Sequence, residues 1–210
     1  MDYVAIISDL HGNIPALEAT LQDIKRRGIS RIFCLGDLVG KGPHSDKIVD
    51  MCQDVCEGTV MGNWDDFIVR ETDKPTIMWH QQRLGAERLA YLHQLPNTID
   101  FCMSGRRVRL FHASQESVYY RVRMDDPREK HLDMFTNTDF TGDGPEPDVV
   151  GYGDIHRAYV VNFQRQTLFN VGSVGPSRYH PSVVRCFRGD VCKPTRRYLF
   201  RSFGAGPLRY

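Results

Sequence analysis

Residues 3–13 read Tyr3-Val4-Ala5-Ile6-Ile7-Ser8-Asp9-Leu10-His11-Gly12-Asn13, and this stretch decides the fold. The apolar run 3–7 predicts a buried strand, Gly12 allows a tight turn, and Asn13 is a typical cap for the helix that follows. Asp9 and His11 therefore lie at the carboxyl end of a strand, beside a helix N-terminus. A carboxylate and an imidazole suit a divalent transition metal, and a helix N-terminus suits a phosphate. The same pattern also occurs as a plain cap with a surface histidine.

Bulk composition predicts a soluble globular protein. The chain has 210 residues, 41% of them hydrophobic and 25% charged, which is long enough for one domain with a large core. It contains no apolar run of membrane-spanning length and no signal-peptide pattern, so we expect a cytoplasmic protein whose six cysteines are reduced. The net charge of +1 gives no strong signal for nucleic acid or for a membrane surface.

Strands and helices alternate in the first third of the chain. The predicted elements are strands at 3–8, 31–35 and 57–61 and helices at 14–27 and 45–54. This order predicts a parallel sheet covered by helices, in which ligands bind at the carboxyl ends of the strands. Asp9, Asp37 and Asn63 each follow one of these strands, and each gap between them fits one crossover.

The remaining two thirds predict a second sheet. Residues 64–95 are helical in pattern with a break at Pro75, and a turn at Ser104-Gly105 joins two strands between residues 97 and 112. Residues 114–148 predict a loop-rich cap with a short helix at 128–135. Further strands are predicted at 149–151, 158–163, 167–171, 182–187 and 197–203. We expect a mostly antiparallel sheet that packs on the first one, in a single domain spanning 1–210.

Side chains that can bind metals recur at the predicted strand ends. The set is Asp9, His11, Asp37, Asn63, His112 and His156, with Asp154 two residues before the last. A mixed nitrogen and oxygen set with a central carboxylate that can bridge is what a two-metal site requires, with the ions about 3.5–4 Å apart.

These motifs, taken in order, resemble the calcineurin-like metallophosphoesterase superfamily. The matching segments are Asp9-x-His11, Gly36-Asp37, Gly62-Asn63, His112 and Gly153-Asp154-Ile155-His156. Residues 36–43 and 170–176 are similar to the family's small bacterial phosphodiesterases and dinucleotide tetraphosphate hydrolases, and the resemblance covers about residues 3–180. It implies an α/β fold, a four-layer α/β/β/α sandwich of two packed mixed sheets.

The resemblance also implies two divalent metal ions, with Mn expected and Fe, Mg, Ni and Zn as alternatives. Asp9, His11 and His156 would hold the first ion, Asn63 and His112 the second, and Asp37 would bridge them. A hydroxide between the ions would attack phosphorus in line. Candidate substrate contacts are Lys41 and Arg178, as cations that neutralise phosphoryl oxygens, and His44, which lies near the metal-edge loop.

Trp64 is the first departure from the family pattern, because the family often has a histidine directly after the asparagine. An indole cannot deliver a proton to a leaving oxygen, and general acid help contributes typically about 10²–10⁴-fold. We therefore expect substrates whose leaving group departs as a stable anion, such as a nucleotide or a phenolate. Trp64 can also stack on a base, or simply pack at the edge of the sheet.

Asp154 is the second departure, at the position where the family has a histidine for the second metal. A carboxylate there would make the site harder and favour Mn²⁺, Mg²⁺ or Fe. Alternatively it falls short of the ion and leaves a weak or disabled second site.

The expected function is hydrolysis of phosphodiester or nucleotide phosphoanhydride bonds in a small, nucleotide-like substrate. Two alternatives stay open at this point. One is a phosphomonoesterase, including a protein phosphatase, and the other is a catalytically silent binding module with the same fold. The sequence does not indicate an oligomeric state.

Overall fold

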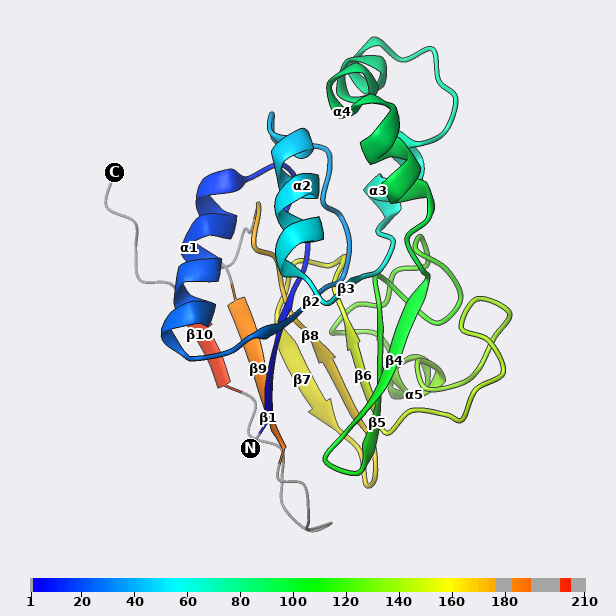
Figure 1. Cartoon of the computed structure of the whole chain (residues 1–210). Coiled ribbons are helices and arrows are strands. Elements are labelled where there is room, and N and C mark those ends of the chain that lie inside the picture. Colours follow the sequence, from blue (N-terminus) through cyan, green and yellow to red (C-terminus); the bar gives the residue numbers. More distant parts are fainter. Residues whose placement is uncertain (1, 177–182, 190–200, 205–210) are drawn as a thin grey trace.

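Two five-stranded sheets form the centre of the molecule (Figure 1). The computed structural model describes residues 2–176, 183–189 and 201–204. The first sheet has the order β10 (Arg201–Gly204), β9 (Val183–Gly189), β1 (Asp2–Ile7), β2 (Arg31–Cys34), β3 (Gly58–Thr59). The second has the order β4 (Thr98–Met103), β5 (Arg106–Phe111), β6 (Val149–Tyr152), β8 (Thr167–Asn170), β7 (Tyr159–Asn162). The helices are α1 (Ile14–Arg26), α2 (Ser45–Val55), α3 (Asn63–Ile68), α4 (Pro75–His93) and α5 (Arg128–Asp133).

Strand β1 is buried on both faces, which explains its uninterrupted apolar sequence. Ala5 and Ile7 belong to the core under the helices, together with Leu17 of α1. Val4 and Ile6 point the other way and belong to the core between the two sheets. Strand β1 pairs in parallel with β2, and β2 pairs in parallel with β3. Helices α1 and α2 form the crossover connections that these parallel pairs require, and they cover one face of the first sheet (Figure 1).

The outer face of the second sheet is covered by the segment 114–148, which contains α5. Phe111 and Val150 of the sheet pack with Val122, Met134 and Phe135 of this segment. Three apolar interfaces thus separate four layers, and the expected α/β/β/α sandwich of two mixed sheets is confirmed. In the part of the chain that is described, no helix combines the length and the apolar character needed to cross a membrane.

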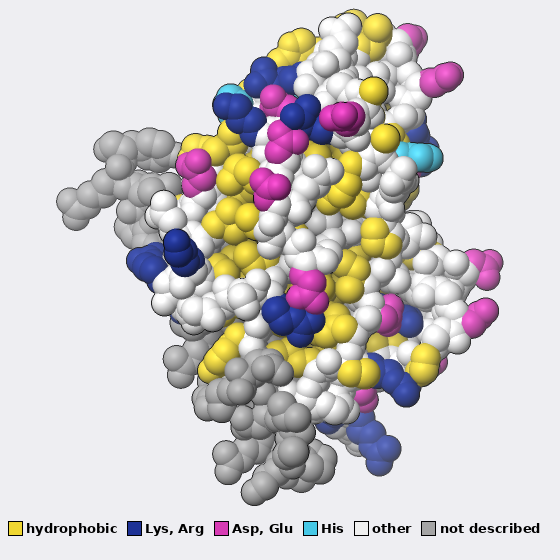
Figure 2. Space-filling model, viewed as in Figure 1, with side chains coloured by type: hydrophobic (Ala, Val, Ile, Leu, Met, Phe, Trp, Pro, Cys, Tyr) yellow, Lys and Arg dark blue, Asp and Glu magenta, His cyan; other side chains and the backbone are white. Residues whose placement is uncertain are grey.

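Charged side chains of both signs are interspersed on the face of the molecule in Figure 2. Two ion pairs join α4 to α2, from Arg83 to Asp46 at 3.0 Å and from Arg88 to Asp50 at 2.6 Å. Both pairs are partly exposed, so each stabilises the fold little.

The pairing of the late strands differs from the prediction. The second sheet is not mostly antiparallel, because β6 pairs in parallel with both β5 and β8. The strands predicted at 182–187 and 197–203 belong to the first sheet, where β9 pairs antiparallel with β1 and β10 pairs with β9. Strand β1 needs a partner on its second edge, and sequence periodicity does not say which strand supplies it. Of these two predicted strands, residues 182 and 197–200 lie outside the described residues.

The predicted helix break at Pro75 and the predicted hairpin turn are both present. Helix α4 begins at Pro75, and Gly85 interrupts its regular backbone with a φ of 72°. Ser104 and Gly105 join β4 to β5 in a two-residue turn with φ values of 54° and 71°. Positive φ at both central residues is what a type I′ hairpin turn requires, and serine is a poor residue for it.

We expect Ser104→Asn to stabilise the protein by about 0.5–1 kcal/mol, because asparagine tolerates the left-handed conformation better. Urea denaturation followed by circular dichroism measures the free energy of unfolding. Ser104→Val serves as the opposite control and should destabilise by about 1 kcal/mol, since β-branching disfavours positive φ. Equal stability of the two variants would contradict this reading of the turn.

Candidate metal centre

Seven polar side chains meet where strands of both sheets end. Asp9 and His11 follow β1, Asp37 follows β2, and Asn63 is the first residue of α3. The second sheet contributes His112 after β5, and Asp154 and His156 after β6. Backbone hydrogen bonds join the loops. The N–H of Asp9 donates to the carbonyl of Gly36 at 3.0 Å, and the N–H of His11 donates to the backbone carbonyl of Asp37 at 2.9 Å.

The backbone is left-handed at most of these residues. Asp9, His11, Asp37, Asp154 and His156 have φ values of 57°, 46°, 55°, 61° and 55°. Such a conformation costs a residue other than glycine about 1–3 kcal/mol and persists only where the surroundings hold it. The strain is concentrated on the residues that the motifs single out.

One group of potential ligands consists of Asp9, His11 and His156, whose ligand atoms lie within 4.8 Å of one another. His156 Nε2 is 3.0 Å from Asp9 Oδ1. The Nδ1 atoms of His11 and His156 donate to the carbonyls of Val39 and Pro176 at 2.9 and 2.6 Å. Each Nε2 therefore faces the centre, where it can bind a metal ion once it is unprotonated.

A second group consists of Asp9, Asp37 and His112, also within 4.8 Å. His112 Nδ1 donates to the carbonyl of Leu35 at 2.7 Å. His112 Nε2 is buried, and no described residue forms a hydrogen bond with it. Asp37 faces both groups, with Oδ2 at 3.4 Å from His11 Nε2 and Oδ1 at 3.5 Å from His112 Nε2. This is the arrangement that a bridging carboxylate needs.

The donor set fits divalent metal ions. Buried carboxylates and imidazole nitrogens converge, and at least one buried nitrogen has no hydrogen-bond partner among the described residues. Mixed nitrogen and oxygen ligands suit Mn²⁺, Fe²⁺ and Zn²⁺ better than a soft metal. Asn63 lies at the same place, with Nδ2 donating to Asp154 Oδ1 at 3.0 Å, which leaves its amide oxygen for an ion.

The pKa values of the histidines at the centre shift in different directions. Burial lowers the pKa of His11 to about 4, so its imidazole is neutral at pH 7. Burial also disfavours a charged His112, but the carboxylates of Asp37, Asp9 and Asp154 outweigh it and raise the pKa of His112 to about 9. Burial raises the pKa of Asp37 to about 7. In the first group, burial disfavours a charged His156, but the carboxylate of Asp9 outweighs it and raises the pKa of His156. Both groups thus hold protons that an ion must displace.

Asp65 organises the loops beneath the centre, and sequence reasoning missed it. Its buried carboxylate accepts backbone N–H groups from Asp37 at 2.7 Å, Leu38 at 3.0 Å and Gly62 at 3.0 Å, with Val39 at 3.3 Å. It thereby ties the loop of Asp37 to the start of α3. An acidic residue three positions after Gly62, in the first turn of a helix, is the signal that points to it.

Arg121 is the other residue that sequence reasoning did not place at the centre. It comes from the segment 114–148, and its Nε and Nη2 donate to the two oxygens of Asp154 at 2.6 Å each. Asp154 therefore reaches the centre, 3.9 Å from His112 Nε2, but as the partner of a guanidinium. The segment's lack of hydrophobic periodicity left Arg121 without a predicted position.

The residues predicted to contact substrate differ in how close they lie to the centre. Lys41 reaches the centre, with Nζ 2.8 Å from His11 Nε2. Trp64 packs against Gly40 and stands edge-on to His11, with ring centroids 6.0 Å apart. His44 is the N-cap residue of α2. Arg178 lies outside the described residues.

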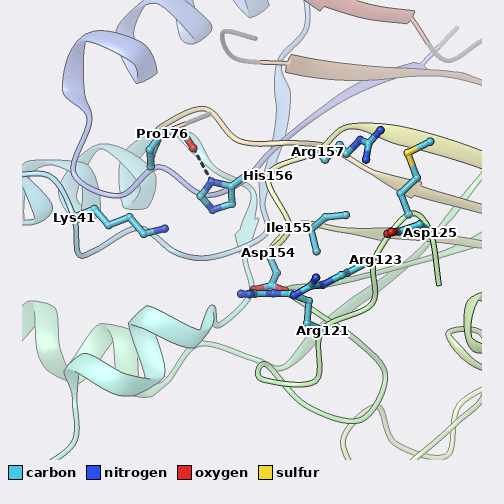
Figure 3. Close-up of a pocket in the computed structure, with 10 residues that line it drawn as sticks. Lys41, Arg121, Arg123, Asp125, Asp154, Ile155, His156, Arg157 and Pro176 are labelled. Carbon is cyan, nitrogen blue, oxygen red and sulfur yellow. Dashed lines mark hydrogen bonds and ion pairs between the residues drawn. The ribbon is translucent and has the colours of Figure 1, made fainter. Parts of the chain in front are cut away.

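A cavity of about 730 Å³ opens beside the centre (Figure 3). Its charged lining consists of Lys41, Arg121, Arg123, Arg157, Asp125 and Asp154, and neither Trp64 nor His44 belongs to the described lining. Figure 3 shows Arg121 against Asp154, with His156 and Lys41 on another side of the cavity. Cations outnumber carboxylates, so the cavity suits an anion.

Comparison with known proteins gives one family. A family model described as the calcineurin-like phosphoesterase superfamily domain matches residues 3–190. The uncharacterized protein MJ0912 of Methanocaldococcus jannaschii is 31% identical over 160 residues, which are 72% of this chain and 59% of that protein. The chain therefore spans about three fifths of the length of this relative.

Solved structures are similar in fold. A metallophosphoesterase from Sphaerobacter thermophilus is 23% identical with a TM-score of 0.74, covering 96% of this chain and 88% of that one. A protein described as a putative diadenosine tetraphosphatase is 21% identical with a TM-score of 0.58, covering 98% and 95%. At these identities the likeness concerns the fold alone.

We expect Asp65→Ala to destabilise the protein by about 3 kcal/mol or more, because several buried backbone N–H groups would lose their hydrogen-bond acceptor at once. The measurement is urea denaturation of the metal-free protein. Asp66→Ala is the matched control, since Asp66 pairs with Arg70 at the surface and should contribute less than about 1 kcal/mol. Similar losses in the free energy of unfolding of the two variants would contradict the stabilising role assigned to Asp65.

We expect the affinity for Mn²⁺ to rise with pH between about pH 6 and pH 8, by up to about tenfold per unit. The sign follows from the raised pKa of His112, because an ion that takes Nε2 must displace a proton. Titration calorimetry in buffers of different ionisation enthalpy measures both the affinity and the protons released. His112→Asn should flatten the slope. An affinity that does not change with pH would contradict the prediction.

Proposed function

The chain belongs to the calcineurin-like phosphoesterase superfamily, and from this premise we propose that it hydrolyses phosphodiester or nucleotide phosphoanhydride bonds with two divalent ions. The observation that carries the proposal is the position of Asp37, whose two oxygens face His11 on one side and His112 on the other. In this proposal Asp9, His11 and His156 hold one ion, and Asn63 and His112 hold the other.

The ions, when bound, supply an activated water molecule and positive charge for the phosphoryl oxygens. The protein's own residues fix the geometry. The histidines are oriented by the carbonyls of Val39, Leu35 and Pro176, so that each presents Nε2 to the centre. Lys41 lies at the junction of the centre and the cavity, where its ammonium can bind a phosphoryl oxygen.

The class of substrate follows from the leaving group and from the cavity. Trp64 stands where the family often has a proton-donating histidine, and its indole packs against the Gly40 loop. A leaving group that departs as a stable anion needs little protonation, which favours aryl diesters and nucleotide anhydrides over alkyl esters. The cationic cavity and the name of one structural neighbour, a putative diadenosine tetraphosphatase, favour a nucleotide-like substrate.

One observation favours the silent binding module as the second candidate. Arg121 engages both oxygens of Asp154, so a residue at the second metal position is already partnered by a cation. A protein that never assembled its second ion would bind an anion in the cavity without turnover.

Metal-stripped protein assayed on bis(p-nitrophenyl) phosphate, with and without added Mn²⁺, tests the proposal. We expect turnover that depends on Mn²⁺ and exceeds the rate on p-nitrophenyl phosphate. Asp37→Asn should lose at least about 100-fold, because a bridging ligand contributes no less than an outer-shell partner does. Asp66→Ala, a surface carboxylate variant, should retain the rate.

The other outcomes separate the alternatives. A rate on the monoester equal to that on the diester would favour a phosphomonoesterase. A protein that binds Mn²⁺ but turns over neither ester would favour the binding module.

A further inference from the structure

The carboxylate of Asp154 has a built-in cationic partner. Arg121 donates to both of its oxygens at 2.6 Å, in the two-pronged geometry that makes guanidinium–carboxylate pairs strong. Asn63 adds a third hydrogen bond at 3.0 Å. The Asp154 side chain is only 2% exposed, so it needs a cation whenever it is charged.

We propose that Arg121 and the second divalent ion compete for Asp154, so that the second ion binds only when the guanidinium withdraws. The inference rests on the proposed function, because it requires an ion held by Asp37, Asn63 and His112. The oxygen of Asp154 nearest to His112, at 3.9 Å from Nε2, is one of the two that Arg121 occupies. A guanidinium and a dication at that oxygen would repel each other.

Arg121 can withdraw without unfolding the segment that carries it. The backbone is fixed, because the carbonyl of Arg121 accepts from Lys130 at 3.1 Å and that of the buried Val122 accepts from Tyr152 at 2.9 Å. The Arg121 side chain is 49% exposed and lines the cavity. Rotation about its side-chain bonds would therefore carry the guanidinium from Asp154 into the cavity beside Arg123 and Lys41 (Figure 3).

Among the described residues, the competitor at the first metal position is weaker. Lys41 Nζ lies 2.8 Å from His11 Nε2 and 5.9 Å from the centre of the Trp64 ring, so it approaches one neutral imidazole nitrogen and does not form a two-pronged pair with a carboxylate. Asp9 is approached by His156, a ligand of the same ion, at 3.0 Å. The two positions should therefore differ in affinity, with a tight first ion and a second ion weakened by Arg121. An anion in the cavity would stabilise the withdrawn guanidinium and favour the second ion.

Equilibrium dialysis of the full chain against Mn²⁺ tests the inference. The wild type should bind one ion tightly and a second more weakly. Arg121→Met, which keeps the aliphatic stem and removes the charge, should strengthen the second site by about 10–100-fold, the range over which outer-shell partners change metal affinity. Electron paramagnetic resonance should show the signal of a coupled Mn²⁺ pair at lower Mn²⁺ in this variant.

Arg123→Met is the matched control, because it removes one cation from the same cavity without a contact to Asp154. Its second-site affinity should change by less than about threefold. Arg121→Lys keeps the charge but loses the bidentate contact with the carboxylate. The affinity of its second metal site should lie between those of the wild type and Arg121→Met. A thermal melt of each variant establishes that it folds.

An unchanged or weaker second site in Arg121→Met would overturn the inference, as would equal gains in Arg121→Met and Arg123→Met. Either result leaves the proposed function standing, provided that both variants and the wild type still bind two ions. Failure of every form to bind a second Mn²⁺ would instead overturn the proposed function.

Discussion

Four backbone N–H groups converge on the buried carboxylate of Asp65, and the geometry of the whole centre depends on this interaction. It joins the loop after β2 to the first turn of α3, so that Asp37 and Asn63 share one frame. Gly36 and Gly62 make the approach possible, because a Cβ atom on either would lie within 2.4 Å of the other loop's backbone. The carboxylate of Asp65, which is not itself a candidate metal ligand, thus fixes the positions of Asp37 and Asn63.

The same frame explains why the ligand residues tolerate a left-handed backbone. The left-handed residues follow strands β1, β2 and β6, at the edge where the ligand side chains meet. The strain is offset by hydrogen bonds between loops and by the apolar interfaces below. Rigidity of this kind favours metal binding, because the ligands need little reorganisation when an ion arrives.

Much of the fold and of the candidate metal centre could be predicted from the sequence, because the relevant signals are local. A carboxylate after an apolar strand, repeated at crossover spacing, places Asp9 and Asp37 at one edge without any knowledge of tertiary structure. The turn at Ser104-Gly105 and the break at Pro75 are likewise set by a few neighbouring residues. The partner of β1 and the parallel pairing of β6 depend on distant segments, and periodicity does not encode them. Arg121 escaped prediction because its position depends on how an aperiodic segment folds over the second sheet.

The pairing of β9 with β1 has a consequence for how the molecule is made. Strand β1 carries Asp9 and His11, yet one of its edges is completed by residues 183–189, far along the chain. During synthesis, strand β1 therefore has one unpaired hydrogen-bonding edge until residues 183–189 have been added. Contacts of such long sequence separation form slowly, and an unpaired edge is a place where chains can associate wrongly. The step that closes the first sheet is thus the one at which a nascent chain most needs protection.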